Sequence, residues 1–139
     1  MDPCIDFLCN IIWMLLGGWV AFLIYVTGGV LLCLSIVGLP FGYECFKLSL
    51  VGLWPFGKEI HWNLGESSTT KTVFNVVWMV LLGWLLCLVH LLLMVLFAVT
   101  LVGIPFAVQH WKLAKVALWP FGTTIAKPDS FPGRGCCPA

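Results

Sequence analysis

The stretch Val37-Gly38-Leu39-Pro40-Phe41 recurs 65 residues later as Val102-Gly103-Ile104-Pro105-Phe106. With that shift, residues 10–60 align with residues 75–125 without a gap, and 22 of the 51 positions are identical. The matches include Trp, Pro and Gly, which a leucine-rich composition would not bring into register, so the chain is a tandem duplication. We divide it into a first repeat at 5–60, a polar linker at 61–72, a second repeat at 73–125 and an exposed tail at 126–139.

Two long charge-free segments predict that the repeats lie in a membrane. No charged residue occurs between Asp6 and Glu44, or between Lys71 and Lys112. Each gap exceeds the ~20 apolar residues that cross a ~30 Å hydrocarbon core. Only 9% of the residues are charged and the mean hydropathy is +1.05, whereas soluble domains are about 25% charged. We therefore predict an all-α, multi-pass integral membrane protein of the plasma or inner membrane.

Further positions shared by the two copies carry a family resemblance. Each copy begins with Asn-x-x-Trp (10–13 and 75–78), continues with Gly-Trp and Val-Gly-[Leu/Ile]-Pro, and ends with Leu-Trp-Pro-Phe-Gly (53–57 and 118–122). The set resembles the inner membrane component domain, the YccF family, over about residues 5–125. The resemblance implies a short membrane protein with two such domains, and no particular activity.

Each repeat is expected to form one long transmembrane helix followed by a shorter helix. The long helices are predicted at about 6–37 and 72–102. The breaks are predicted at Gly38, Pro40, Gly103 and Pro105, because proline removes a backbone donor and glycine tolerates the turn. The short helices should cover about 41–53 and 106–118. No strand is expected, because a helix satisfies its own backbone in lipid.

The short helix decides the topology, and two models remain open. In the favoured model it is interfacial or re-entrant, each repeat crosses the membrane once, and the repeats run antiparallel. In the other model it crosses back, and the linker and the tail then share one side, as the positive-inside rule prefers. A crossing of about 15 residues would span only ~22 Å and would place Lys112 and Lys115 in the core.

The two long helices differ in the size of the residues on one face. Gly17, Ala21, Gly28 and Ser35 form a ridge of small residues on the first helix, and their equivalents in the second helix are three leucines and a threonine. Small faces let helices approach closely in lipid. We expect a bulky helix face, from the second repeat or from another subunit, to pack there; the alternative is that the glycines only loosen or kink the helix.

Tyr25 and His90 occupy equivalent positions midway along the two long helices. A titratable group inside a membrane is a functional-site hypothesis, and histidine suits proton sensing or pore lining. The alternative is a neutral histidine that is hydrogen-bonded to a facing helix.

A second candidate group lies on the short helices. Glu44, Lys47, Lys112 and Lys115 are expected at the interface, where they would meet lipid headgroups or line a water-filled vestibule. Gln109 replaces Glu44 in the second copy, so a symmetrical pair of carboxylates cannot form.

The seven cysteines contain no Cys-x-x-Cys spacing and predict neither a metal site nor a disulfide framework. Cys136 and Cys137 are candidates for lipidation, and an unmodified tail is the alternative. We expect no cofactor.

The sequence predicts a non-enzymatic structural or accessory membrane component. No combination of nucleophile and base, and no phosphate-binding glycine loop, occurs in the sequence. The alternative is a subunit of an oligomeric ion channel or small-solute conduit. The expected partners are membrane lipids and either further copies of the chain or a larger membrane complex. Nucleic acid is excluded, because the net charge is only +1 and there is no basic stripe.

Overall fold

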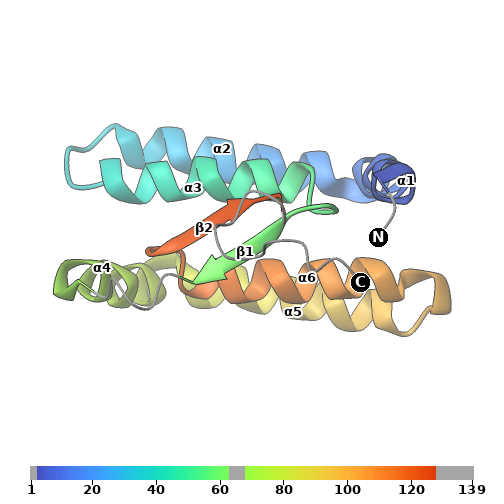
Figure 1. Ribbon diagram of the computed structural model, residues 1–139. Coiled ribbons are helices and arrows are strands. Elements are labelled where there is room, and N and C mark those ends of the chain that lie inside the picture. The colour runs from blue at the N-terminus through green and yellow to red at the C-terminus, as the bar shows by residue number, and fades with distance from the viewer. Residues whose placement is uncertain (1–2, 63–67, 128–139) are drawn as a thin grey trace, which may run out of the picture.

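The computed structural model describes residues 3–62 and 68–127, which form two similar repeats of helices and one strand each (Figure 1). The first repeat contains α1 (Pro3–Trp13), the π-helical segment η1 (Met14–Gly18), α2 (Trp19–Cys33), α3 (Leu39–Leu53) and β1 (Glu59–Trp62). The second contains α4 (Thr69–Trp78), the π-helical segment η3 (Met79–Gly83), α5 (Trp84–Ala98), the 3-10 turn η4 (Leu101–Gly103), α6 (Ile104–Leu118) and β2 (Thr123–Ala126).

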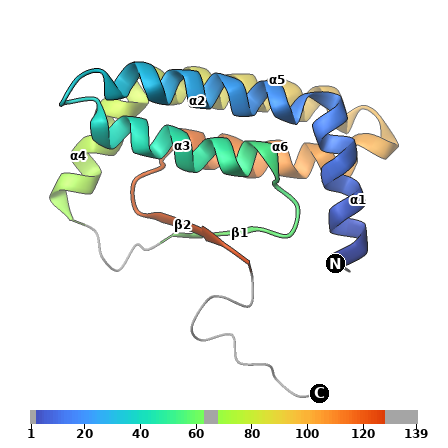
Figure 2. The same ribbon diagram turned by 90° about the horizontal axis from the view of Figure 1, so that it is seen from above.

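The elements are arranged in layers. Figure 2 shows α2 and α5 together on one side, α3 and α6 next to them, and the two strands beyond α3 and α6. Helices α1 and α4 turn away from the α2 and α5 layer toward the side of the strands. Both repeats therefore begin and end on the strand side of the molecule.

An approximate twofold axis relates the two repeats. Strands β1 and β2 pair antiparallel, and Ile60 pairs with Ile125, its own equivalent under the 65-residue shift. Tyr25 and His90 are also equivalent to each other, and their side chains lie 2.9 Å apart (Tyr25 Oη to His90 Nε2). A residue meets its own equivalent only on the axis, so the axis runs from the centre of the strand pair to the contact between α2 and α5.

The described chain is mostly helical, as predicted, but the prediction of an all-α protein is wrong in one respect. The strands β1 and β2 occur where the linker and the tail were expected to begin. Each strand follows a repeat, and each satisfies its backbone by pairing with the other. The argument against strands holds for a segment surrounded by lipid, whereas the strand pair lies outside the helical layers.

The long helix predicted in each repeat is also divided. Helix α1 and helix α2 are joined through η1, where Gly17 has a φ of 125°. The conformation is one that residues with a side chain rarely adopt. Helix α2 has 15 residues, about 22 Å at 1.5 Å per residue. The bend therefore leaves a straight segment shorter than a hydrocarbon core of ~30 Å.

The Asn-x-x-Trp motif fastens the start of each repeat to the end of its short helix. The Asn10 side chain donates to the Phe56 carbonyl at 3.1 Å and accepts from the Phe56 N–H at 3.0 Å. Trp13 Nε1 donates to the Gly52 carbonyl at 2.7 Å. This carbonyl lies in the last turn of α3, where helical acceptors lack intrahelical partners.

The second repeat makes the same contacts with its own residues. Asn75 donates to the Phe121 carbonyl at 2.9 Å and accepts from its N–H at 3.0 Å. Trp78 Nε1 donates to the Ala117 carbonyl at 2.7 Å. The repeated motif is therefore explained by a repeated set of buried hydrogen bonds.

The glycine of the Gly-Trp pair leaves room for the folded-back indole ring. A Cβ added at Gly18 would lie 2.3 Å from Trp13 Cδ1, and one at Gly83 would lie 2.8 Å from Trp78 Cδ1. Any side chain at these positions would displace the ring and its hydrogen bond. The spacing from Trp to Gly is thus set by this contact.

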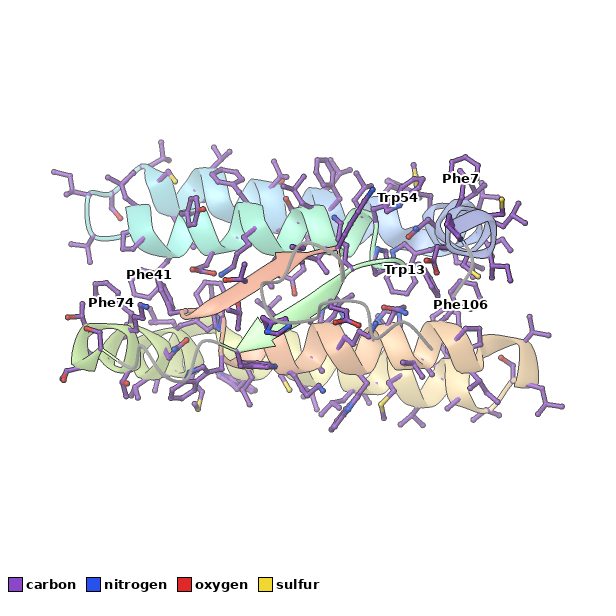
Figure 3. All side chains as sticks on the ribbon, viewed as in Figure 1. Phe7, Trp13, Phe41, Trp54, Phe74 and Phe106 are labelled. Atoms are coloured by element: carbon purple, nitrogen blue, oxygen red, sulfur yellow. The ribbon has the colours of Figure 1, made fainter. Side chains whose placement is uncertain are left out.

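The phenylalanine after each Gly-x-Pro joins the two repeats. The Phe41 ring of the first repeat stacks on Trp78 of the second, with centroids 6.3 Å apart. The Phe106 ring stacks in the same way on Trp13, also at 6.3 Å. Figure 3 shows Trp13 and Phe106 on facing elements. The indole that ties each repeat together is therefore also the surface on which the other repeat packs.

We predict that Asn10→Leu lowers the free energy of unfolding by about 2–4 kcal/mol, because it leaves the buried N–H and carbonyl of Phe56 without partners. Asn75→Leu should cost a similar amount, since the contacts are equivalent. The measurement is SDS-induced unfolding in detergent micelles, with the exposed substitution Thr27→Val as a control. A loss below about 0.5 kcal/mol, the usual range for a surface change, would contradict the role of the asparagine.

Neighbouring glycines of α2 provide a second prediction. A Cβ at Gly29 would lie 3.0 Å from Phe46 and 3.1 Å from the Cβ of Cys45, whereas a Cβ at Gly28 meets nothing within 4 Å. Gly29→Leu should therefore separate α2 from α3 and destabilise the fold by about 1–3 kcal/mol. Gly28→Leu should leave the fold intact.

Thermal unfolding and the mass of the detergent-solubilised particle distinguish the two glycine variants. An equal loss of stability in both would contradict the close approach at Gly29. A change of mass in Gly28→Leu alone would place the small-residue ridge between subunits, as one of the sequence-based expectations has it.

Candidate functional site

A chain of three buried polar side chains lies at the contact between the repeats. Tyr25 Oη is 2.9 Å from His90 Nε2, and His90 Nδ1 is 3.2 Å from His110 Nδ1. The exposed fractions of Tyr25, His90 and His110 are 3%, 4% and 6%. The structure therefore brings together the predicted pair, Tyr25 and His90, and adds His110 from α6.

The packing around this polar chain is aromatic. The Trp13 ring lies 4.7 Å from the His110 ring, and the Phe97 ring stacks on it at 5.4 Å and 14°. The Tyr25 and His90 rings are nearly parallel, at 11°. These contacts fix the ring orientations, so the hydrogen-bonding atoms are held in place by packing.

The polar chain forms part of the wall of a cavity of about 460 Å³ between α2 and α5. The cavity is otherwise lined almost wholly by apolar residues of η1, α2 and α5, together with Trp13 and His110. Several of these are exposed at its mouth, including Leu16, Ile24 and Leu96, with exposed fractions of 54%, 58% and 66%. The cavity thus has an apolar mouth and a polar inner wall.

The difference between the two repeats explains where this cavity lies. Gly17 and Ala21 line it on the side of the first repeat. At the equivalent positions of the second repeat stand the larger residues Leu82 and Leu86. The small-residue ridge predicted from the sequence therefore contributes two of its members to a cavity wall.

The other two members of that ridge lie elsewhere. Gly28 has no contact within 4 Å of an added Cβ. Ser35 lies in the turn after α2, where its hydroxyl donates to the Leu32 carbonyl at 3.2 Å and accepts from the Gly38 N–H at 3.0 Å. Within the described chain the close approach between helices occurs at Gly29 and Gly42, where an added Cβ at Gly42 would lie 2.8 Å from the Gly29 carbonyl oxygen.

The predicted helix breaks coincide with sharp turns between paired helices. Pro40 and Pro105 stand in the first turn of α3 and α6, where a missing N–H costs no hydrogen bond. A Cβ at Gly38 would lie 2.0 Å from the Leu32 carbonyl oxygen, and one at Gly103 would lie 2.1 Å from that of Phe97. Glycine is therefore required where the chain reverses.

Among the charged residues of the short helices, Lys47 contacts the strand side of the molecule. Lys47 forms an ion pair with Glu44 and donates to the carbonyls of Pro120 and Thr123, at 2.9 and 3.2 Å. The Lys115 ammonium lies 5.6 Å from the centre of the Trp111 ring. Lys112, the equivalent of Lys47, is half-buried on α6.

Lys58 belongs to the same side, although the sequence did not single it out. It follows α3 and donates to the Leu50 carbonyl at 2.9 Å. Partial burial lowers the pKa of Lys58 below its ordinary value.

The sequence did not indicate His110 or the hydrogen-bond partners of the Asn-x-x-Trp motif. His110 stands opposite a cysteine, Cys45, in the alignment of the repeats, so no repeated pattern marked it. Asn10 and Trp13 were recognised as a motif, but their hydrogen-bond partners lie 46 and 39 residues away. Cys136 and Cys137 lie outside the described residues.

Within residues 3–62 and 68–127, no group of three or more His, Cys, Asp or Glu side chains could hold a metal ion. By length and composition alone, two helical segments, Pro3–Cys33 and Thr69–Ala98, could cross a membrane, each counted through the π-helical segment that divides it.

Comparison with known proteins agrees with this architecture. The family model described as the inner membrane component domain, YccF, matches twice, at residues 8–58 and 73–123. The inner membrane protein YccF of Escherichia coli K12 is 30% identical over 129 residues, which cover 87% of each chain. The protein of the same name from Shigella flexneri matches equally well, and no solved structure matches. The prediction of a membrane protein with an internal repeat is confirmed, and the chain belongs to the YccF family of inner membrane component domains.

Proposed function

We propose that the chain is a non-enzymatic structural or accessory component of the membrane, in which both repeats enter and leave the bilayer on the same side. The observation that carries this proposal is the division of the molecule into a charge-free apolar face and a polar face that contains the strands.

The apolar face is formed by α2, α5 and the turns that follow them. Neither helix contains a charged residue. Their outward side chains are exposed, with fractions of 62% at Leu31 and 63% at Leu92. The turns are more exposed still, at 87% for both Ile36 and Leu101. A continuous apolar surface of this kind would be costly in water, and it is the surface that a bilayer covers.

The polar face lies beyond α3 and α6 (Figure 2). Glu44, Lys47, Lys112 and Lys115 belong to these two helices. Lys58 and Lys127 flank the strand pair. This order of layers supports a placement in the bilayer in which α2 and α5 lie in hydrocarbon. In this placement α3 and α6 lie nearer the headgroups, and the strands lie in water.

The pairing of the two strands also bears on the membrane topology. Strand β1 follows the first repeat, β2 follows the second, and the two are hydrogen-bonded to each other. Segments on opposite sides of a ~30 Å hydrocarbon core cannot pair. The pairing therefore supports the arrangement in which the linker and the tail share one side, and it speaks against a single crossing by each repeat.

The polar chain at the contact between the repeats supports a non-enzymatic role. Tyr25, His90 and His110 form hydrogen bonds with one another. The cavity that they face is lined by no serine, threonine, cysteine, lysine or carboxylate of the described chain. The hydroxyl of Tyr25, the one hydroxyl among the cavity-lining residues of the described chain, is hydrogen-bonded to His90.

We predict that Lys58→Cys and Lys127→Cys react with a membrane-impermeant maleimide from the same side of the membrane. Ile36→Cys should react from neither side until detergent is added, because it lies on the apolar face. Each substitution is made in a chain whose seven natural cysteines have been replaced, and right-side-out vesicles are compared with inverted ones. Reaction of Lys58→Cys and Lys127→Cys from opposite sides would overturn the proposed topology.

A further inference from the structure

The polar chain of Tyr25, His90 and His110 has more donor hydrogen atoms than hydrogen bonds. Neutral Tyr25, His90 and His110 supply three hydrogens, one O–H and one N–H from each imidazole. These three side chains form only two hydrogen bonds with one another. One donor is therefore left without an acceptor in the chain, whichever way the protons are placed.

Only two arrangements satisfy both hydrogen bonds. If His90 is protonated at Nε2, it donates to Tyr25 and accepts from His110, and the Tyr25 O–H is left over. If His90 is protonated at Nδ1, it donates to His110 and accepts from Tyr25, and the His110 Nε2–H is left over. The donor without an acceptor thus lies at one end of the polar chain, on Tyr25 or on His110.

Both of these residues line the cavity between α2 and α5. A donor without an acceptor is costly where water is scarce, and in the proposed placement the apolar mouth of the cavity opens toward hydrocarbon. A ligand that brought an acceptor oxygen to the inner wall would therefore complete the hydrogen bonding of the chain.

We propose that the cavity binds a neutral membrane-soluble carbonyl compound of the quinone class. A neutral ligand fits because no cation lines the cavity in the described chain. A planar ring suits the aromatic side chains of Trp13 and Phe97, which also line the cavity. An apolar tail fits along Val20, Ile24, Val89 and Leu93. The volume of about 460 Å³ lies within the about 300–1,000 Å³ of small-molecule sites.

The probe is decylubiquinone, titrated calorimetrically into the purified full-length chain in detergent micelles. The comparison compound is decylbenzene, which has the same tail and a ring but no carbonyl. We expect saturable binding of one decylubiquinone per chain, and affinity for decylbenzene about five- to tenfold lower, the share of one hydrogen bond. Equal affinity for the two compounds would overturn the hydrogen-bonding role of the polar chain.

Two tryptophan substitutions on α2 locate the site. Ile24→Trp should weaken decylubiquinone binding by about tenfold or more, because it fills the mouth of the cavity. Leu31→Trp should have no effect, because Leu31 lies two turns further along the same exposed face and outside the cavity. If Ile24→Trp does not yield folded protein, Val89→Trp replaces it at the equivalent position of α5.

The proposed site would be refuted if Ile24→Trp bound decylubiquinone as tightly as the natural chain, or if the natural chain did not bind it. The inference rests on the proposed placement of α2 and α5 in hydrocarbon, but the two fail separately. Loss of same-side labelling refutes the placement, whereas normal labelling without decylubiquinone binding refutes only the ligand site.

Discussion

The fold depends on one pair of side chains that each repeat uses in the same way. An asparagine and a tryptophan near the start of the repeat hold the backbone at the end of its short helix, through contacts such as Trp13 to the Gly52 carbonyl at 2.7 Å. Buried donors and acceptors at a helix end must find partners, and more strictly so where water is excluded. These bonds bring the two ends of the repeat together, which fixes the bend between α1 and α2 and sends the following strand back to the side from which the repeat began. The same indole then receives Phe106 of the other repeat, so closing one repeat also creates the surface for joining two.

Because the repeats meet on a twofold axis, any residue on that axis faces its own equivalent. Ile60 with Ile125 preserves the symmetry, whereas Tyr25 with His90 breaks it and creates a polar contact. The break extends outward: His110 stands where the first repeat has Cys45, and Ala21 stands where the second has Leu86. Together these differences accompany a cavity with a polar wall between α2 and α5. A duplicated scaffold thus supplies the rigidity, and a few unequal positions supply a site.

Much of this architecture could be predicted from the sequence. The 65-residue shift and the charge-free segments identified the repeats and the membrane, and Gly38 and Pro40 marked the helix reversal, because glycine and proline restrict the backbone locally. The strands were missed, because the residues of Glu59–Trp62 pair with residues 61 to 67 positions further along the chain. A kink at Gly17 was one of the two interpretations of the small-residue ridge, but the matching π-helical segment η3, which has Leu82 at that position, was not foreseen because such a segment has no strong local signal. For the site, Tyr25 and His90 could be found as an unequal pair in an otherwise apolar helix, but His110 joins them only through the packing of α5 on α6.

The central claim is that the ends of the two repeats meet on one side of the membrane. Cysteines at Glu59 and Ala126, which are directly paired across the two strands, test it in intact membranes. In a chain without other cysteines, mild oxidation should join them within one molecule, since paired strand residues have Cβ atoms about 5 Å apart. The offset combination of Glu59 with Thr123 should join much more slowly. Failure of the Glu59 and Ala126 pair to form a disulfide, in membranes where each cysteine alone reacts with maleimide, would contradict the account.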